Sequence, residues 1–348
     1  MTRANFLKAS CFVVGLAICA FPAHAAELQP PRLQRLIRLR KLPSERIPVV
    51  SALAIQPSGN VLATAGDDHL VRLWDFRTGQ LIRRLSGHED WVTAVAFSAD
   101  GSQLITGGRD RRVLIWSVDD GRRLGSLGDH ENAVSAIVTS ASRDLVAVVG
   151  FRSPLKLFDL TSGRRLQSMV CPCSDMRAIV FSPDLRYLAG GGRNGRIRIW
   201  DLQSGAYHDL VGHQRRVRTL TFTRHSDRLI SAGEDRSIRV WNVASGKLLH
   251  EIKGAPGKVL AMTIIGPDQL ATASADNVIR LWSLSEPEPL ATLTGHTGSV
   301  AALDARDDML ISGSFDTTVR VWSLAGNLRA VDASFQRPPR FISIGAGN

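Results

Sequence analysis

The chain has 348 residues, with 43 Lys and Arg against 32 Asp and Glu, and its formal net charge at pH 7 is +11. It contains only four Cys, which excludes a fold that depends on a disulfide framework. The basic balance suggests acidic partners, and the length fits either two domains or one long all-β domain.

The first residues have the three parts of a secretory signal. Arg3 and Lys8 form a positive start, residues 9–21 are apolar, and a small-x-small pattern ends at Ala25. We expect cleavage after Ala25, so residues 1–25 are a signal peptide and the mature chain is periplasmic or secreted. The alternative is an uncleaved anchor or a buried N-terminal helix. An exported protein does not meet the genome, so we expect no nucleic-acid partner, and no membrane span after cleavage.

Two segments compete for one structural place near the ends of the remaining chain. Residues 33–42 come before the first of seven similar units, and residues 326–335 follow the last of them. Only one of the two can supply the final strand of the last unit. We favour the N-terminal segment because its large apolar residues are more numerous. The tail 336–348 has an irregular pattern.

Between these segments a repeat fills the chain. Seven times along the chain, aliphatic residues at every second position come before an aromatic residue, and successive aromatic residues are 40 to 42 positions apart. This two-residue alternation predicts β-strands. Gly, Pro, Asp and Ser separate the apolar runs, so each unit predicts four short strands. One such sheet cannot bury both of its faces, whereas a closed ring of sheets can. The aromatic residues are Trp74, Trp116, Phe158, Trp200, Trp241, Trp282 and Trp322.

These units resemble the WD-repeat family of β-propellers, and the resemblance covers residues 50–323. It implies an all-β, seven-bladed β-propeller of four-stranded antiparallel blades within residues 32–335, and it favours closure by the N-terminal segment. In that family each blade has a Gly-His pair before the first strand and a Ser or Thr on the second. An Asp follows in the turn before the third strand, and the Trp lies on that strand. The resemblance implies that Asp, His, hydroxyl and Trp form one hydrogen-bonded set inside the blade.

Three blades contain the whole set. The sets are His88, Thr106, Asp110 and Trp116 in blade 2, His213, Ser231, Asp235 and Trp241 in blade 5, and His296, Ser312, Asp316 and Trp322 in blade 7. Blades 1 and 6 lack only the His, which is replaced by Arg46 and Ala255.

Blades 3 and 4 are adjacent, and both depart further from the family pattern. Blade 3 keeps His130 but has other residues at the remaining places, and blade 4 keeps only its Trp. The replacements are Val148, Arg152 and Phe158 in blade 3, and Pro172, Gly190 and Asn194 in blade 4.

No enzymatic signature is found, so we expect no catalytic residue, metal ion or cofactor. The Asp, His and Ser of the sets recur at constant offsets, whereas a catalytic triad would occur once. The other histidines lack the spacing of metal ligands. The glycine-rich residues 189–196 come before a predicted strand, not a helix, which is atypical of a phosphate loop. Much of the positive charge is supplied by one Arg or Lys two places before the aromatic in most units.

Candidate binding residues lie in the loops of one face. The resemblance points to the top face, which is formed by the loops before the first strands and the turns before the third strands. Aromatic residues combined with Arg are typical of protein contact sites, although each aromatic can instead fold into its own loop. The candidates are Trp91, Arg109, Phe151, Arg193, Arg216 and Phe315.

We therefore expect a non-catalytic scaffold, monomeric by itself, that binds a protein or peptide partner on its top face. The alternative is an enzyme, or a protein that binds a small ligand or polyanion in the central channel or at blades 3 and 4.

Cys171 and Cys173 lie in the loop that enters blade 4. A metal site needs more ligands than His130, which is one blade away. A catalytic redox pair usually has a CxxC motif at a helix start, and no helix is predicted here. Two idle thiols and a local disulfide remain. We predict the disulfide, which would close a small, strained ring and fix a loop that has lost its His.

Overall fold

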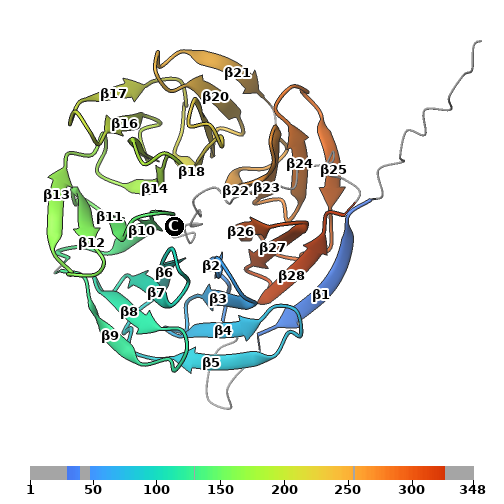
Figure 1. Cartoon of the computed structure of the whole chain (residues 1–348). Coiled ribbons are helices and arrows are strands. Elements are labelled where there is room, and N and C mark those ends of the chain that lie inside the picture. Colours follow the sequence, from blue (N-terminus) through green and yellow to red (C-terminus); the bar gives the residue numbers. More distant parts are fainter. Residues whose placement is uncertain (1–29, 40–47, 129, 254, 326–348) are drawn as a thin grey trace, which may run out of the picture.

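The computed structural model contains seven four-stranded antiparallel sheets, built from 28 strands, and no helix within the described residues. The sheets stand as blades around one central axis (Figure 1). This arrangement confirms the predicted seven-bladed propeller. The structure describes residues 30–39, 48–128, 130–253 and 255–325.

The strands of each blade follow one another outward from the central axis. The innermost strands of blades 1 to 7 are β2 (Ala52–Ile55), β6 (Val92–Phe97), β10 (Val134–Thr139), β14 (Met176–Phe181), β18 (Val217–Phe222), β22 (Val259–Gly266) and β26 (Val300–Arg306). The second strands are β3 (Val61–Ala65), β7 (Gln103–Gly108), β11 (Leu145–Gly150), β15 (Tyr187–Gly192), β19 (Arg228–Gly233), β23 (Gln269–Ser274) and β27 (Met309–Ser314).

The third strands contain the aromatic residue of each repeat, and the fourth strands form the rim. The third strands are β4 (Val71–Asp75), β8 (Val113–Ser117), β12 (Leu155–Asp159), β16 (Ile197–Asp201), β20 (Ile238–Asn242), β24 (Ile279–Ser283) and β28 (Thr318–Ser323). The fourth strands of blades 1 to 6 are β5 (Leu81–Leu85), β9 (Arg123–Ser126), β13 (Arg165–Met169), β17 (Tyr207–Leu210), β21 (Leu248–Ile252) and β25 (Pro289–Leu293).

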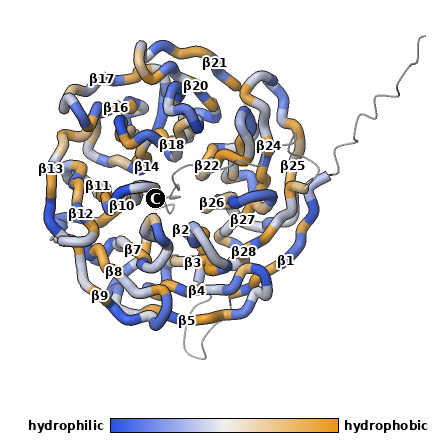
Figure 2. The backbone as a smooth tube through the Cα atoms, in the orientation of Figure 1, coloured by the Kyte–Doolittle hydropathy of each residue, from blue (hydrophilic) through white to orange (hydrophobic). Residues whose placement is uncertain are grey.

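Burial decreases from the inner strands to the rim. Every residue of the inner strands β6, β10 and β18 is buried, because neighbouring blades cover both faces of each sheet. The rim strand β5 is buried only at its last residue, and β9 has no buried residue. Figure 2 shows that hydrophobic (orange) and hydrophilic (blue) segments alternate around the rim, so the rim is less uniform in hydropathy than in exposure.

The apolar core is divided among the seams between blades. One cluster joins blades 1 and 2, another joins blades 2 and 3, and similar clusters lie between blades 5 and 6, 6 and 7, and 7 and 1. Blades 3, 4 and 5 differ, because a single continuous cluster passes through all three of them. Met176 and Trp200 of blade 4 lie within this cluster.

The N-terminal segment closes the ring. Strand β1 (Arg32–Arg38) pairs antiparallel with β28 as the fourth strand of blade 7, with Leu33 opposite Trp322. Figure 1 shows β1 in blue beside the red strands of the last blade. Residues 326–335, which competed for this place, lie outside the described residues, as do the predicted signal and the tail 336–348.

A second contact closes the same seam on the inner side. Asp304, which is buried on β26, accepts a hydrogen bond from the backbone N–H of Ile55 on β2 at 2.7 Å. The buried side chain of Arg306 donates to the carbonyl oxygens of Gln56 and Gly59. Residues more than 240 positions apart are thus joined by charge-assisted hydrogen bonds, which are stronger than neutral ones.

Candidate functional site

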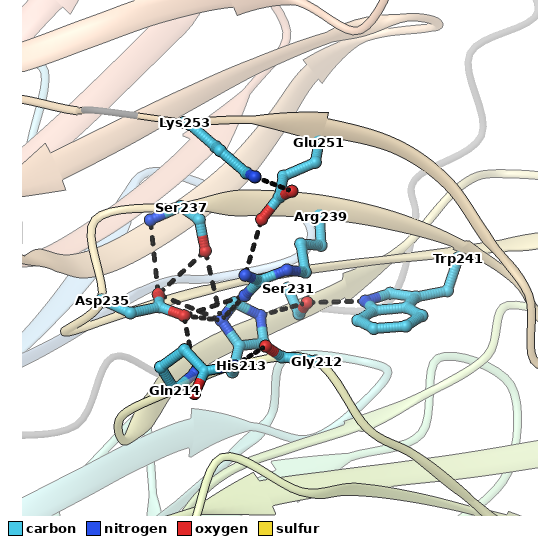
Figure 3. Close-up of polar contacts among 10 residues, drawn as sticks. All are labelled: Gly212, His213, Gln214, Ser231, Asp235, Ser237, Arg239, Trp241, Glu251 and Lys253. Carbon is cyan, nitrogen blue, oxygen red and sulfur yellow. Dashed lines mark hydrogen bonds and ion pairs between the residues drawn. The ribbon is translucent and has the colours of Figure 1, made fainter.

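The set in blade 5 connects the top-face turn to the centre of the blade (Figure 3). His213 Nδ1 lies 2.9 Å from Asp235 Oδ2, and His213 Nε2 lies 2.7 Å from Ser231 Oγ. The indole N–H of Trp241 donates to the same hydroxyl at 2.8 Å. An ionised carboxylate only accepts, so the Nδ1–H donates to Asp235, Nε2 accepts from Ser231, and Ser231 accepts from Trp241.

Asp235 also fixes the groups around it. It accepts from Arg239 at 2.8 Å and from the backbone N–H of Gln214 at 3.1 Å. Burial alone would raise the pKa of Asp235, but its hydrogen bonds from His213 and Arg239 more than offset this effect, so the pKa lies well below its usual value. Burial lowers the pKa of His213, although Asp235 acts in the opposite direction. His213 is therefore neutral at pH 7, in agreement with the assigned tautomer.

Blades 2 and 7 contain the same arrangement. His88 lies 2.8 Å from both Asp110 and Thr106, and Trp116 donates to Thr106 at 2.9 Å. In blade 7 the corresponding distances from His296 to Asp316 and Ser312 are 2.8 Å, and Trp322 donates to Ser312 at 2.9 Å. All three histidine side chains are buried, so these sets stabilise the blades from within.

In the two blades that lack only the His, the turn Asp still pairs with the Arg of the third strand, as Asp235 does with Arg239 in blade 5. Asp68 of blade 1 pairs with Arg72 at 2.5 Å, and Asp276 of blade 6 pairs with Arg280 at 2.7 Å. Each Arg is two residues before the Trp, at the place that supplies much of the positive charge. These arginines are therefore neutralised within their own blades. Arg46 lies outside the described residues.

Blade 4 replaces the polar set with apolar packing. A Cβ atom added to Gly190, which occupies the hydroxyl place, would lie 2.4 Å from the end of the Met176 side chain and 3.0 Å from the Trp200 ring. A Ser or Thr therefore does not fit there without movement of Met176. Asn194, at the Asp place, donates to the carbonyl oxygen of Pro172 at 3.0 Å and so still connects the turn to the entry loop.

Blade 3 has a turn of different shape. Arg152, at the Asp place, has a positive φ of 50°, whereas in blade 2 the positive φ falls one residue later, at Arg111. His130 contacts the carbonyl oxygen of Leu127 at 3.0 Å. Phe158 is buried and fills the place of the Trp.

The two cysteines are free in the structure, which corrects the predicted disulfide. Cys171 donates to the carbonyl oxygen of Ser153 at 3.5 Å, and Cys173 donates to that of Asp175 at 3.6 Å. Each sulfur thus has its own backbone acceptor. Both side chains pack against the apolar cluster of blades 3 to 5, and burial raises the pKa of Cys171 to about 11. The thiols are packing groups in the blade 4 entry loop.

The aromatic candidates of the top face differ in exposure. Phe151 is 36% exposed, and the guanidinium of Arg152 lies over its ring. Trp91 is half-buried, and the guanidinium of Arg109 lies 4.2 Å from its ring centroid. Phe315 is also half-buried. Trp91 and Arg109 therefore form one stacked unit.

The arginine candidates also differ. Arg193 is exposed, and its side chain has no ion pair within the described part of the chain. Arg216 is instead bound between two carboxylates, 3.1 Å from Asp175 Oδ2 and 3.2 Å from Glu234 Oε1. The structure brings Phe151 close to this group, because Phe151 forms an isolated β-bridge with Asp175.

Arg216 is the middle member of a larger group that the sequence analysis missed. Arg177 lies 2.7 Å from Asp175 at one end, and Arg218 Nε lies 2.7 Å from Glu234 at the other. Arg177 and Asp175 belong to blade 4, and the other three belong to blade 5. We call these five residues, which alternate in charge, the arginine–carboxylate chain.

The positions of Arg177 and Arg218 explain how the arginine–carboxylate chain forms. The register of each inner strand in blades 2 to 7 shifts at its second residue, and such a β-bulge re-aims the side chain of the extra residue. In blade 2 this residue is Thr93, whose hydroxyl donates to Val134 of the next blade. Arg177 and Arg218 occupy the same place in blades 4 and 5. Comparing the second residue of the inner strand across the seven repeats could have identified these two arginines from the sequence.

Two exposed valines lie on either side of blade 4. Val170 and Val211 precede the entry loops of blades 4 and 5, and they are 74% and 68% exposed. Arg198 donates to the carbonyl oxygen of Val170 and binds Asp209 through two hydrogen bonds. The irregular blades thus present apolar side chains to solvent at the top face.

Neither a metal site nor a spanning helix is found in the described ranges. No group of three or more His, Cys, Asp or Glu residues there is arranged to hold a metal ion. The same residues include no helix with the length and apolar character needed to cross a membrane.

Two family models match the chain. The model described as the IFT122 first beta-propeller matches residues 49–286, and that of the WD domain, G-beta repeat, matches residues 287–323.

Similar curated proteins match over short segments. The chain is 44% identical over 66 residues to mitochondrial division protein 1 of Kluyveromyces lactis, which is 18% of this chain and 9% of that protein. It is 34% identical over 64 residues to a lissencephaly-1 homolog of Caenorhabditis briggsae, which is 18% and 15% of the two chains. It is 53% identical over 34 residues to nuclear distribution protein PAC1 of Coprinopsis cinerea, 10% of this chain and 8% of that protein. The chain thus matches less than a fifth of the length of each.

Proposed function

Because the chain belongs to the WD40-repeat family of β-propellers that includes the IFT122 first beta-propeller, we propose that it is a non-catalytic scaffold. It binds a protein or peptide partner on the top face of the ring. The observation that carries this proposal is the exposed apolar and basic surface around the entry loops of blades 4 and 5. Phe151, Val170 and Val211 are exposed there, and Arg193 is free to pair.

The contacts within this surface support a binding role. The turn of blade 3 bonds to the blade 4 entry loop through Cys171 and Asp175, so Phe151 and Val170 lie on connected segments. Exposed aromatic and aliphatic side chains beside Arg have the composition of hot spots in protein interfaces. Trp91 and Arg109 provide a second stacked anchor on blade 2.

Site-specific photo-crosslinking in the native cell tests the binding face. A photoreactive amino acid is placed at Phe151 or Arg109 on the top face, and at Ser162 or Gln203 in exposed turns of the opposite face as controls. We expect the same partner to crosslink from both top positions and not from the controls. Crosslinks from the control positions alone would contradict the proposal.

A double variant tests the contribution of the stacked anchor. Trp91→Ala with Arg109→Ala should weaken the crosslink from Phe151 about tenfold, because hot-spot residues dominate interface affinity. The free energy of unfolding should fall by about 1 kcal/mol or less, since both residues lie at the surface. Retained crosslinking together with a large loss of stability would show that the pair serves packing.

We also propose that the chain is exported, as residues 1–25 suggest. This segment lies outside the described residues, and the three relatives named above are eukaryotic proteins. Terminal sequencing of the protein from its native cell tests the proposal. A mature chain that begins at Ala26 supports export, and an intact Met1 contradicts it.

A further inference from the structure

The arginine–carboxylate chain has an excess of positive charge in a buried place. Its three arginines face only two carboxylates, and an arginine stands at each end. The side chains of Arg218 and Asp175 are only 8% and 4% exposed. Nearby arginines also affect the ionisation of Arg218: burial lowers its pKa, Glu234 raises it, and the like charges of Arg216 and Arg177 lower it further.

Three buried donors of the arginine–carboxylate chain have no hydrogen-bond acceptor among the described residues: Arg177 Nε, Arg216 Nε and Arg218 Nη1. Arg177 Nε still lies 2.7 Å from Asp175 Oδ1 as an ion pair, so Arg216 Nε and Arg218 Nη1 are the two without a carboxylate partner. Leaving a buried charged donor without an acceptor costs free energy, so binding of an acceptor from another molecule would be favoured. The planar fork of a guanidinium fits a carboxylate in particular.

The propeller itself does not need arginine at these positions. At the place of Arg177 and Arg218, blade 3 has Ser135, which donates to Met176 across the seam. Blades 6 and 7 have Leu260 and Ala301 at the same place, and their inner strands pair with the second strands with the same register shift. An apolar residue is therefore compatible with closure, which argues against a purely structural role.

A groove leads away from the arginine–carboxylate chain along the top of blades 5 and 6. Its lining includes five basic residues, Arg215, Arg236, Arg239, Lys253 and Lys258, and three acidic ones, Glu234, Asp235 and Glu251. Burial raises the pKa of Glu234, but the positive charges around it, those of Arg218 and Lys258 among them, lower this pKa by more, so it lies below its usual value. The groove therefore offers an extended segment a surface with an excess of positive charge.

We propose that this surface binds an acidic segment of the partner, with side-chain carboxylates accepting hydrogen bonds from Arg218 and Arg216. The proposal rests on the proposed function and names the chemistry of the partner. Several basic residues spread along the groove favour a run of Asp or Glu over a single chain terminus.

Direct binding of a capped, fluorescently labelled oligoglutamate peptide tests the proposal. The full mature chain should bind this peptide at physiological ionic strength, and binding should weaken as salt is added. A capped oligoglutamine peptide should not bind. An oligoglutamine peptide with a free carboxyl terminus should also fail, and equal binding of that peptide would overturn the assignment to side-chain carboxylates.

Substitutions then locate the site. Arg218→Leu, which copies blade 6, and Arg216→Gln should each weaken oligoglutamate binding about tenfold or more, because each removes charge-assisted donors. Arg123→Gln, an exposed change on the rim strand β9, removes one positive charge elsewhere and should leave binding unchanged. Equal binding by all three variants would overturn the proposal.

A measurement on the unmodified protein covers the case in which Arg218→Leu fails to fold. The arginine Nε–Hε signals of Arg216 and Arg218, observed by NMR, should shift when oligoglutamate is added. Unchanged signals in the presence of bound peptide would place the peptide elsewhere. If the peptide fails to bind while Phe151 still crosslinks to a partner, this inference is wrong and the proposed function stands. Crosslinks from the control face alone would instead refute the proposed function.

Discussion

Blades 4 and 5 are neighbours, yet they hold the same tryptophan in different ways. In blade 5, Trp241 donates to Ser231, and the set continues through His213 to Asp235 in the top turn. In blade 4, Gly190 leaves the hydroxyl place empty, and the end of the Met176 side chain and the indole ring of Trp200 fill the space.

The difference shows that the polar set stabilises a blade but is not needed to form one. Apolar packing takes the place of the set inside blade 4, where one apolar cluster runs unbroken through blades 3, 4 and 5. The loss of the set leaves the top turn with fewer bonds. Residues of the irregular blades are consequently available for contacts outside the ring, and Phe151 and Val170 are exposed there.

The largest test of this comparison removes the turn carboxylate from blade 5. Asp235→Ala should lower the free energy of unfolding by about 3 kcal/mol, because His213, Arg239 and the loop at Gln214 all lose their acceptor. Asn194→Ala in blade 4 should lower it by about 1 kcal/mol or less, since only two exposed hydrogen bonds are lost, one to Pro172 and one from the backbone N–H of Arg196. Chemical denaturation of both variants measures the two values, and equal losses would contradict the assignment.

The fold was predictable because its signals repeat. Seven aromatic residues at nearly constant spacing indicate seven similar sheets, and the excess of large apolar residues in 33–42 indicated the closing strand that β1 provides. The hydrogen-bond sets followed from a family pattern that blades 2, 5 and 7 match residue by residue.

The arginine–carboxylate chain was not predictable in the same way. Arg177 and Arg218 stand at the β-bulge, and the direction of a side chain at a bulge depends on strand register. Their carboxylates come from other elements: Asp175 precedes β14, and Glu234 lies in the turn after β19. The sequence shows that these residues exist, and only the packing of blade 4 against blade 5 shows that they meet.

A smaller expected effect concerns local opening of the top turns. At pH 7, backbone amides of residues 190–195 in blade 4 should exchange hydrogen roughly tenfold faster than those of residues 233–237 in blade 5. About 1–2 kcal/mol of hydrogen bonding separates the two turns. Hydrogen exchange, corrected for intrinsic rates, measures the ratio. Equal protection at pH 7 would show that the set does not fix its turn.

Lowering the pH should reduce the difference in hydrogen-exchange protection between the two turns, because the blade 5 turn loses protection. Burial and Asp235 together leave the pKa of His213 below its usual value of 6.5, so the opened state takes up a proton first as the pH falls. The stabilisation from this group is thus complete above pH 6.5 and is lost as the pH falls through the folded-state value. Asp235 adds a second loss below its usual value of 3.8. The blade 5 turn should lose protection in both windows, and a turn that gains protection on acidification would contradict the set.

The smallest expected effect is that of the two thiols. Cys171 and Cys173 are unbridged and packed against the core cluster of blades 3 to 5. Because only the thiolate reacts, a pKa of about 11 makes Cys171 slow to alkylate in the native protein near neutral pH. Cys171→Ser should lower the free energy of unfolding by about 1 kcal/mol or less, since Ser can still donate to the carbonyl of Ser153. Protein that is denatured without reductant and then alkylated should carry a label on both thiols by intact mass. A protein that takes up no label would contain the disulfide predicted from the sequence, and the entry loop of blade 4 would then differ from the arrangement described above.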